Sequence, residues 1–266
     1  MFREDYAEIN RKLWDKRTGI HFESDFYGVE KFLLGEEILN SIETDLLGDV
    51  KNKALLHLQC HFGMDTLALA RKGAIVTGID LSEAAISKAN ELRKKMNLHA
   101  DFICCNVYDT LLHTQKKFDI VFTSYGVIGW LPDLTLWAKV ISKALQPGGV
   151  FVMAEFHPVV WMFNNEFNNI EYSYFNKQAI VETEQGTYAE RHADIPENTS
   201  VTWNHGISEV LSALLHQGLE IEIFLEYDYS PYSCFNNSVE VAKNRFQIAG
   251  MEGKLPMVYA LKARKK

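Results

Sequence analysis

The sequence has few cysteines, and their spacing suggests neither a metal site nor a disulfide framework. Its four cysteines are Cys60, the adjacent pair Cys104 and Cys105, and Cys234. Zinc ligands come in pairs such as Cys-x-x-Cys or His-x-x-x-His, and no such pair occurs in the chain. We therefore expect no metal, and thiols that stay reduced, as they do in the cytoplasm.

Long apolar runs are also missing. Stretches such as residues 150–154 are far shorter than the roughly 20 residues that a membrane-spanning helix needs. The first five residues are mostly charged and no apolar segment follows them, so the chain does not open like a secreted protein. These absences predict a cytoplasmic protein without a membrane partner.

Basic charge is scarce as well. Lys and Arg number 27 against 35 Asp and Glu, which gives a formal charge of −8. A nucleic-acid binder needs clustered Lys and Arg for its phosphate contacts, and the short basic ending at residues 262–266 reads as a solvated tail. We expect no nucleic-acid partner, and nothing in the pattern specifies an oligomeric state.

What the chain does have is an alternation of short apolar runs with helical segments. Its 266 residues, 47% of them hydrophobic, suffice for one large α/β domain with an elaboration, or for two small domains. Helical patterns near 65–70, 82–92 and 134–144 separate the apolar runs. This alternation predicts parallel βαβ units, with strands at residues 54–58, 74–79, 100–105, 118–123 and 150–154.

The flanking regions complete the expected fold. Residues 1–50 have helical spacing and are interpreted as an N-terminal helical lid, and 207–216 is a further helix. Residues 156–205 are rich in aromatics and Asn and read as an inserted substrate cap or as short hairpins. Residues 219–225 and 256–262 read as two strands that form an antiparallel pair at the C-terminal edge. The prediction is a Rossmann-like, seven-stranded, mostly parallel sheet with helices on both faces, built from 51–155 and 206–266.

Asp80 is the most informative single residue. In an open parallel sheet, ligands bind beyond the carboxyl ends of the strands, and Asp80 ends the second strand. It follows Gly63 by 17 residues, close to the spacing at which an acid accepts hydrogen bonds from ribose hydroxyls. The alternative is an acid that caps the next helix.

The loop before this strand carries a family resemblance. Residues 59–63 read Gln-Cys-His-Phe-Gly, and with the apolar strand before them and Asp80 after them they resemble class I S-adenosylmethionine-dependent methyltransferases. Those enzymes carry a Gly-x-Gly-x-Gly loop here: Gly63 matches the last glycine, Gln59 and His61 replace the first two, and His57 replaces the usual acid. Residues 130–133, 155–158 and 203–205 resemble a bacterial subfamily to which no substrate is assigned.

The resemblance implies S-adenosylmethionine as the cofactor. Asp80 would bind the ribose, Asn106 and Val107 the adenine, and Ser124 would lie near the methionine portion. The full set of expected cofactor-binding residues is His57, Gln59, Cys60, His61, Phe62, Gly63, Asp80, Leu81, Ser82, Asn106, Val107 and Ser124.

Methyl transfer requires an oriented acceptor and, where the acceptor arrives protonated, a general base. His157, just after the fifth strand, is the first candidate base, and its alternative role is packing against Pro158. His205 is the second, with helix capping as the alternative. Tyr125, at the end of the fourth strand, is also expected to take part in catalysis, or to belong to an aromatic wall around the acceptor. Aromatic residues of the acceptor site would be Trp130, Trp161, Trp203 and, closing from the lid, Trp14, although aromatic residues of this kind also build cores.

The sequence thus predicts methyl transfer from S-adenosylmethionine to a small molecule by in-line displacement. Two alternatives remain: a non-catalytic S-adenosylmethionine-binding regulatory module, suggested by the altered loop, and a methyltransferase that acts on a macromolecule. A nicotinamide oxidoreductase is disfavoured, because Gln59 and His61 obstruct the close backbone approach that a pyrophosphate needs.

Overall fold

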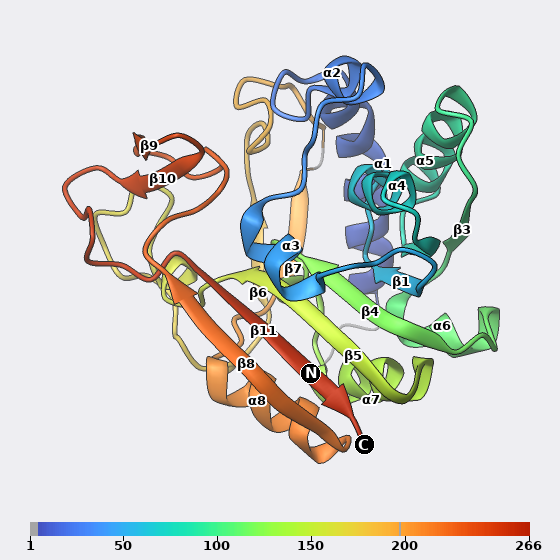
Figure 1. Ribbon diagram of the computed structural model, residues 1–266. Coiled ribbons are helices and arrows are strands. Elements are labelled where there is room, and N and C mark those ends of the chain that lie inside the picture. The colour runs from blue at the N-terminus through green and yellow to red at the C-terminus, as the bar shows by residue number, and fades with distance from the viewer. Residues whose placement is uncertain (1–4, 197) are drawn as a thin grey trace.

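A seven-stranded sheet forms the centre of the molecule in the computed structural model, which describes residues 5–196 and 198–266 (Figure 1). Its strands lie in the order β3-β2-β1-β4-β5-β11-β8. Strands β1 to β5 are parallel, whereas β11 runs antiparallel to both β5 and β8. The seven strands are β1 (Ala54–Leu58), β2 (Ile75–Asp80), β3 (Ala100–Cys104), β4 (Phe118–Ser124), β5 (Leu145–Phe156), β8 (Leu219–Tyr227) and β11 (Val258–Lys265).

Helices cover both faces of this sheet, as predicted. One face carries α3 (Ser41–Leu47), α4 (Met64–Arg71) and α5 (Glu83–Lys95), and the other carries α7 (Leu134–Ala144) and α8 (Ile207–His216). Neighbouring strand residues point to opposite faces of the sheet. The side chain of Leu55 therefore packs in the hydrophobic core under α3 and α4, and that of Leu56 packs in the core under α7 and α8. Burial on both faces explains why the parallel strands read as continuous apolar runs. The predicted fold class and the antiparallel edge pair are confirmed.

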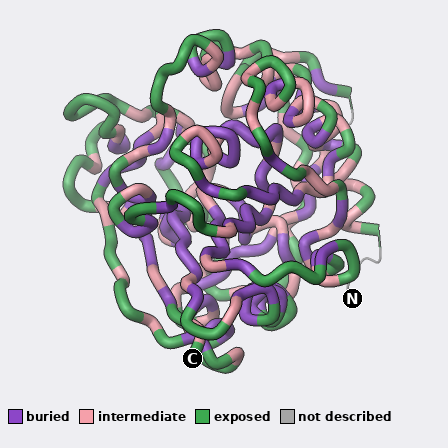
Figure 2. Tube along the Cα trace, turned by 45° about the vertical axis from the view of Figure 1, so that its right-hand side comes forward, coloured by how far each residue is buried: buried purple, intermediate pink, exposed green. Residues whose placement is uncertain are grey.

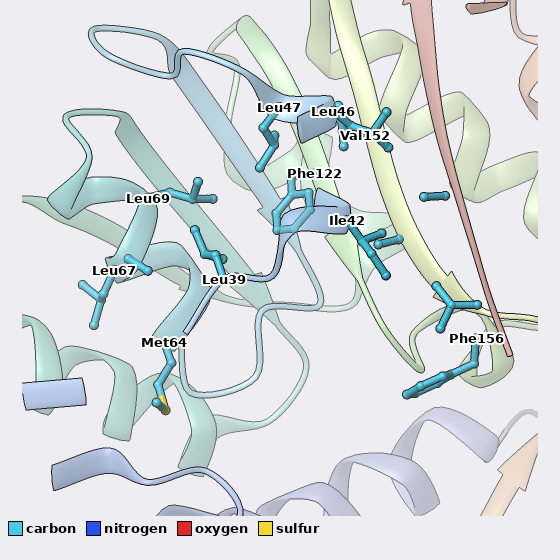
Figure 3. Packing of buried hydrophobic residues seen from close by; sticks show 14 of the residues in the cluster. Leu39, Ile42, Leu46, Leu47, Met64, Leu67, Leu69, Phe122, Val152 and Phe156 are labelled. Carbon is cyan, nitrogen blue, oxygen red and sulfur yellow. The ribbon is translucent and has the colours of Figure 1, made fainter. Parts of the chain in front are cut away.

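Helix α3 packs on the sheet through its buried apolar side chains. Ile42, Leu46 and Leu47 of α3 lie against Phe122 of β4 and Val152 of β5 (Figure 3). Burying a side chain of this size stabilises the fold by about 1.5–3 kcal/mol. Along the whole trace, buried residues gather in the centre and exposed ones follow the outer loops (Figure 2). The packing of α3 fixes the N-terminal segment beside the carboxyl ends of the strands.

The N-terminal segment is helical, as expected, although residues 1–4 of the predicted range lie outside the described residues. It contains α1 (Tyr6–Glu23) and α2 (Val29–Leu33) before α3. Helix α1 packs on α5 and on β7 (Thr199–Thr202). The side chain of Asn10 donates to the carbonyl of Val201 and accepts from its N–H, at 2.8 and 3.0 Å. Helix α1 is thereby joined to the segment 156–205.

Two regions outside the main sheet contain antiparallel strand pairs, and short hairpins were one of the two expectations for residues 156–205. Within 156–205, β6 (Ile180–Thr183) pairs with β7. Between β8 and β11, which were expected to be joined by a loop, β9 (Ser238–Ala242) pairs with β10 (Arg245–Ile248) in a hairpin. Strand β5 also begins five residues earlier than expected. The remaining short helices are α6 (Thr110–His113), η1 (Val107–Asp109), η2 (Ile128–Trp130) and η3 (Val160–Met162).

Within the described part of the chain, none of the helices combines the length and the apolar character that crossing a bilayer would require.

Candidate active site

A cleft of about 1440 Å³ opens at the carboxyl ends of the parallel strands. Its floor is formed by the loops after β1, β2, β3 and β4, and its walls by α1, by residues of 156–205 and by the segment that precedes β9. Strand order reverses between β1 and β4, which is where open α/β sheets bind their ligands. The cleft therefore lies at the edge of the sheet where a ligand is expected to bind.

The loop after β1 follows the course of a glycine loop although two of its glycines are replaced. Gln59 and His61 have φ angles of 55° and 51°, and Gly63 has 76°. Non-glycine residues in this left-handed region each cost of order 1–3 kcal/mol, and such strain gathers at functional sites. At Gly63 a Cβ atom would lie 2.6 Å from the Phe102 ring, so only glycine fits there.

Asp80 lies beside this loop at the end of β2 and lines the cleft. One carboxylate oxygen accepts from the N–H of His61 at 2.7 Å, and the other accepts from the N–H of Ser82 at 2.9 Å. Burial raises the pKa of Asp80 to about 6. Each carboxylate oxygen can accept a further bond, so a ligand with two hydroxyls can still be held.

The other expected cofactor residues lie around this point. All except Ser82 line the cleft. Ser82 instead caps α5, since its hydroxyl accepts from the N–H of Ala85 at 3.0 Å. Asn106 lines the cleft after β3, and its side-chain oxygen accepts from the N–H of Tyr108 at 3.1 Å.

A buried acid, Asp65, is linked to His57 through the hydroxyl of Ser124. His57 is buried and hydrogen-bonds through Nδ1 to the hydroxyl of Thr66 at 2.8 Å, and burial lowers its pKa to about 3. Asp65, in the first turn of α4, lines the cleft and accepts from the Ser124 hydroxyl at 3.1 Å. Burial raises the pKa of Asp65 to about 6. The sequence analysis did not single out Asp65.

The side chains that replace the two glycines tie the loop to its neighbours. Gln59 donates to the carbonyl of Val127 at 2.8 Å, which braces the turn after β4. The His61 ring lies 5.1 Å from Trp14 and 5.4 Å from His21, both on α1, measured between ring centroids. The loop is thereby packed against the first helix.

The expected aromatic residues all line the cleft. Trp14 meets Trp130 edge to face at 5.2 Å, and Trp203 meets Tyr6 in the same way at 5.2 Å. Trp161 lies 5.5 Å from Phe235, a residue of the segment before β9. The cleft is accordingly walled by aromatic faces from three parts of the chain.

The two histidines expected to act as bases lie elsewhere. His157 is 4% exposed, outside the cleft lining, and its Nε2 lies 2.9 Å from Glu226 on β8. His205 is also outside the lining, with Nε2 2.8 Å from the carbonyl of Leu131 and Nδ1 3.0 Å from Glu209. These positions do not fit a general base, because both rings are engaged in contacts between structural elements.

Tyr125 is the remaining candidate of the three, and it has a partner that the sequence analysis missed. It lines the cleft with a φ angle of 29°, and its hydroxyl donates to Glu43 at 2.8 Å. Glu43 lies in α3 and is 1% exposed, and burial raises its pKa to about 7. Its only sequence signal is the capping box with Asn40, which marks a helix start and not a site.

Three segments meet above the cleft. The hydroxyls of Tyr27 and Tyr188 lie 2.6 Å apart and join the loop after α1 to the segment 156–205. Arg191 of that segment donates to the carbonyl of Phe235 at 2.9 Å, and Asn40 donates to the hydroxyl of Tyr232 at 2.8 Å. We call these contacts the roof. Among residues 5–196 and 198–266, no group of three or more His, Cys, Asp or Glu side chains could hold a metal ion.

Comparison with known proteins gives the domain type. Residues 55–149 match a family model described as a methyltransferase domain. An uncharacterized methyltransferase from Synechocystis is 29% identical over 131 residues, which cover 48% of this chain and 59% of that protein. A ubiquinone biosynthesis O-methyltransferase from Coxiella burnetii is 32% identical over 100 residues, 38% of this chain and 42% of that protein. The chain spans about half the length of these curated relatives.

The solved structures agree on the fold. A crystal structure of an S-adenosylmethionine-dependent methyltransferase from Clostridium acetobutylicum superposes with a TM-score of 0.55 at 17% identity, over 92% of this chain and 94% of that one. At this identity the likeness concerns the fold alone. The strand order, the loop with Asp80 and the family match point the same way. Residues 55–149 are therefore similar to a methyltransferase domain, and the chain has the fold of S-adenosylmethionine-dependent methyltransferases.

Proposed function

We propose that the protein transfers a methyl group from S-adenosylmethionine to a small molecule. The observation that carries the proposal is the placement of Asp80 beside a strained, glycine-like loop on the floor of a large cleft. When bound, S-adenosylmethionine supplies a methyl group that a nucleophile displaces from sulfur in line. The protein's task is then to hold the acceptor in line, which in favourable models lowers the barrier by roughly 7–11 kcal/mol.

The residues of the floor fit the parts of this cofactor. Asp80 would bind the ribose hydroxyls, and Asn106 and Val107 would meet the adenine. Asp65 and Ser124 would hold the methionine ammonium, with Asp65 supplying the charge that His57 lacks. The N-terminal helices would serve as a lid and the segment 156–205 as a substrate cap.

The roof supports a small acceptor. Its contacts between Tyr27 and Tyr188 and between Arg191 and Phe235 restrict access from above. A macromolecular acceptor needs an open entrance, so this alternative is less well supported. One relative acts, by its name, as an O-methyltransferase of ubiquinone biosynthesis, which is consistent with a small organic acceptor.

A non-catalytic binding module is the second alternative, and it was motivated by the altered loop. Gln59 and His61 adopt the left-handed angles that glycine would, so their presence does not close the cofactor site. The aromatic walls also leave room beyond the cofactor residues, which a pure binding module would not need.

Thermal melting tests the cofactor half of the proposal directly. A ligand at 100 times its dissociation constant stabilises the folded state by about 2.7 kcal/mol, or roughly 5–10 °C for a protein of this size. We expect this rise with S-adenosylmethionine and S-adenosylhomocysteine and none with NAD. Asp80→Asn should bind both nucleosides about tenfold or more weakly, because its charge-assisted bonds are lost.

Asp101→Asn is the matched control, since Asp101 is an exposed acid on β3. It should retain the full shift. Unchanged melting of the wild-type protein with either nucleoside at millimolar concentration would refute the proposal.

A further inference from the structure

We propose that the acceptor is a neutral aromatic hydroxyl compound, and that Tyr125 takes its proton while passing its own proton to Glu43. The proposal rests on the methyl-transfer function above and names the acceptor class and the base. It begins from the contact between these two side chains, which meet at the cleft wall from β4 and α3.

The direction of the hydrogen bond decides what Tyr125 can offer to a ligand. Its hydroxyl donates to Oε2 of Glu43 at 2.8 Å. A hydroxyl has one proton and two lone pairs, so the lone pairs of Tyr125 remain available to a donor in the cleft. Glu43 is held in place by its other oxygen, which accepts from the N–H of Asn40 at 2.6 Å. The Tyr125 hydroxyl can therefore accept a hydrogen bond from a ligand while it donates to the Glu43 carboxylate, whose position is fixed.

The surroundings of Glu43 suit a group that takes up and releases a proton near neutral pH. Asp65 approaches from α4, Tyr232 from the segment before β9 and Tyr227 from β8. Lys262 of β11, a basic group on a packed element, binds the carbonyl of Leu46 toward the other end of α3. Burial and the nearby Asp65 raise the pKa of Glu43 to about 7, near the optimum for a general base.

The charges along the cleft disfavour an acceptor that arrives as an anion. In the described part of the chain its lining contains only three basic side chains, Arg17, Lys31 and Arg191, against more than three times as many carboxylates. Arg17 binds Asn198 at 2.9 Å, and Arg191 binds the carbonyl of Phe235. A hydroxyl acceptor must therefore enter neutral and lose its proton inside the site.

The wall beside Tyr125 favours an aromatic ring. The Tyr125 ring lies 5.6 Å from Phe156, which in turn lies 5.8 Å from Trp161 and 5.0 Å from Phe235. These faces can pack an aromatic acceptor. A neutral amine is nucleophilic without a base, whereas a hydroxyl needs its proton removed during attack, so the relay favours a hydroxyl.

The acceptor oxygen forms a bond to the methyl carbon while the carbon–sulfur bond breaks and its electron pair stays on sulfur. The acceptor proton moves to the oxygen of Tyr125, and the proton of Tyr125 moves to Oε2 of Glu43. The products are an aryl methyl ether, S-adenosylhomocysteine and a neutral Glu43, which returns its proton to solvent.

Binding to the protein loaded with S-adenosylhomocysteine tests the acceptor class without turnover. Phenol, aniline, benzoate and toluene share one ring and differ in the polar group, and ligand-observed NMR measures weak affinities. We expect phenol to bind roughly tenfold more tightly than toluene, through its bond to Tyr125, and benzoate to bind most weakly. Tyr125→Phe should remove the preference for phenol over toluene. Equal binding of phenol and toluene to the wild-type protein would overturn the proposal.

Kinetics with phenol as acceptor test the role of Glu43. Glu43→Gln keeps the capping box, because Gln also serves at that position, so the variant should fold. We expect kcat to fall about 100-fold or more, with cofactor affinity within twofold of the wild type. The wild-type rate should rise with pH through about 7, and Glu43→Gln should lose this rise. Asp45→Asn, at an exposed acid of the same helix that does not line the cleft, is the control and should match the wild type.

Tyr125→Phe combined with Glu43→Gln should be no slower than the slower single variant, because the two residues act in series. Turnover of aniline or benzoate but not phenol, or no turnover of any of the four ligands, would refute the inference. If the nucleosides still raise the melting temperature in that case, the cofactor assignment stands and only the acceptor and base are wrong.

Discussion

Two buried imidazoles, those of His21 and His61, lie among aromatic rings between α1 and the loop at residues 59–63. His21 is 0% exposed and lies 5.5 Å from Tyr27 and 4.8 Å from Tyr188. Neither ring has a hydrogen-bond partner at either nitrogen among the described residues. Burial lowers the pKa of His21 to about 3 and that of His61 well below its usual range. At neutral pH both therefore act as uncharged aromatic rings.

This arrangement predicts how stability depends on pH. Between about pH 3 and 6.5 the unfolded chain binds a proton that folded His21 refuses, so the free energy of unfolding falls as pH drops through this window. One such group contributes up to about 1.4 kcal/mol per pH unit. His21→Phe preserves the ring packing and should flatten the dependence by about this amount, measured by urea unfolding between pH 4 and 7. His99→Gln, at an exposed histidine, should not, and an equal slope in His21→Phe would contradict the assignment.

For single residues, the sequence predicts those site residues that directly follow a strand. It does not predict those that reach the site only because a helix packs on the sheet. Asp80 and Gly63 could be identified because a motif and the end of a strand fix their positions. Glu43 could not, because it lies 82 residues before Tyr125 and reaches it only through the packing of α3. His157 does follow a strand, but the bend after β5 turns it toward Glu226 on β8, and no local pattern encodes that bend.

Among the elements, α1 is hydrogen-bonded to β7 through the side chain of Asn10. Both hydrogen bonds of Asn10 go to the backbone of Val201, which is fully buried, so the amide imitates a neighbouring strand. Asn10→Ala would leave a buried N–H and a buried carbonyl unpaired, at a cost of about 1–3 kcal/mol each. We expect limited proteolysis within α1 to accelerate about tenfold or more. Lys12→Ala, on the exposed side of the same helix, should leave the cleavage rate unchanged.

The strands of the sheet were easier to predict than the hairpin of β9 and β10. Burial on both faces makes the central strands apolar throughout, which single-sequence patterns reveal readily. The hairpin has the alternation Val239-Glu240-Val241 and a turn residue, Asn244, with a φ angle of 55°. That signal was present but weak, because much of the hairpin is exposed and little of it enters the core.

At the level of the whole molecule, the roof couples three parts of the chain that are far apart in sequence. If the roof opens for the cofactor and closes over it, binding should order all three parts at once. We expect S-adenosylhomocysteine to slow amide hydrogen exchange together in α1, in residues 183–191 and in residues 229–237, measured by mass spectrometry. Protection confined to the loops after β1 and β2 would show instead that the cofactor enters without moving the roof.

The floor and the walls of the cleft come from different parts of the chain, and this affects how such a protein can diverge in sequence. The residues proposed to bind the cofactor all lie between His57 and Ser124, whereas the walls proposed to face the acceptor come largely from residues 156–205 and 228–237. Insertions or replacements in those outer segments leave the sheet and its loops in place, since function in such folds is carried by loops on a rigid scaffold. Selection can therefore exchange the acceptor while retaining the methyl donor, and closely related chains can differ most in the compound that they modify.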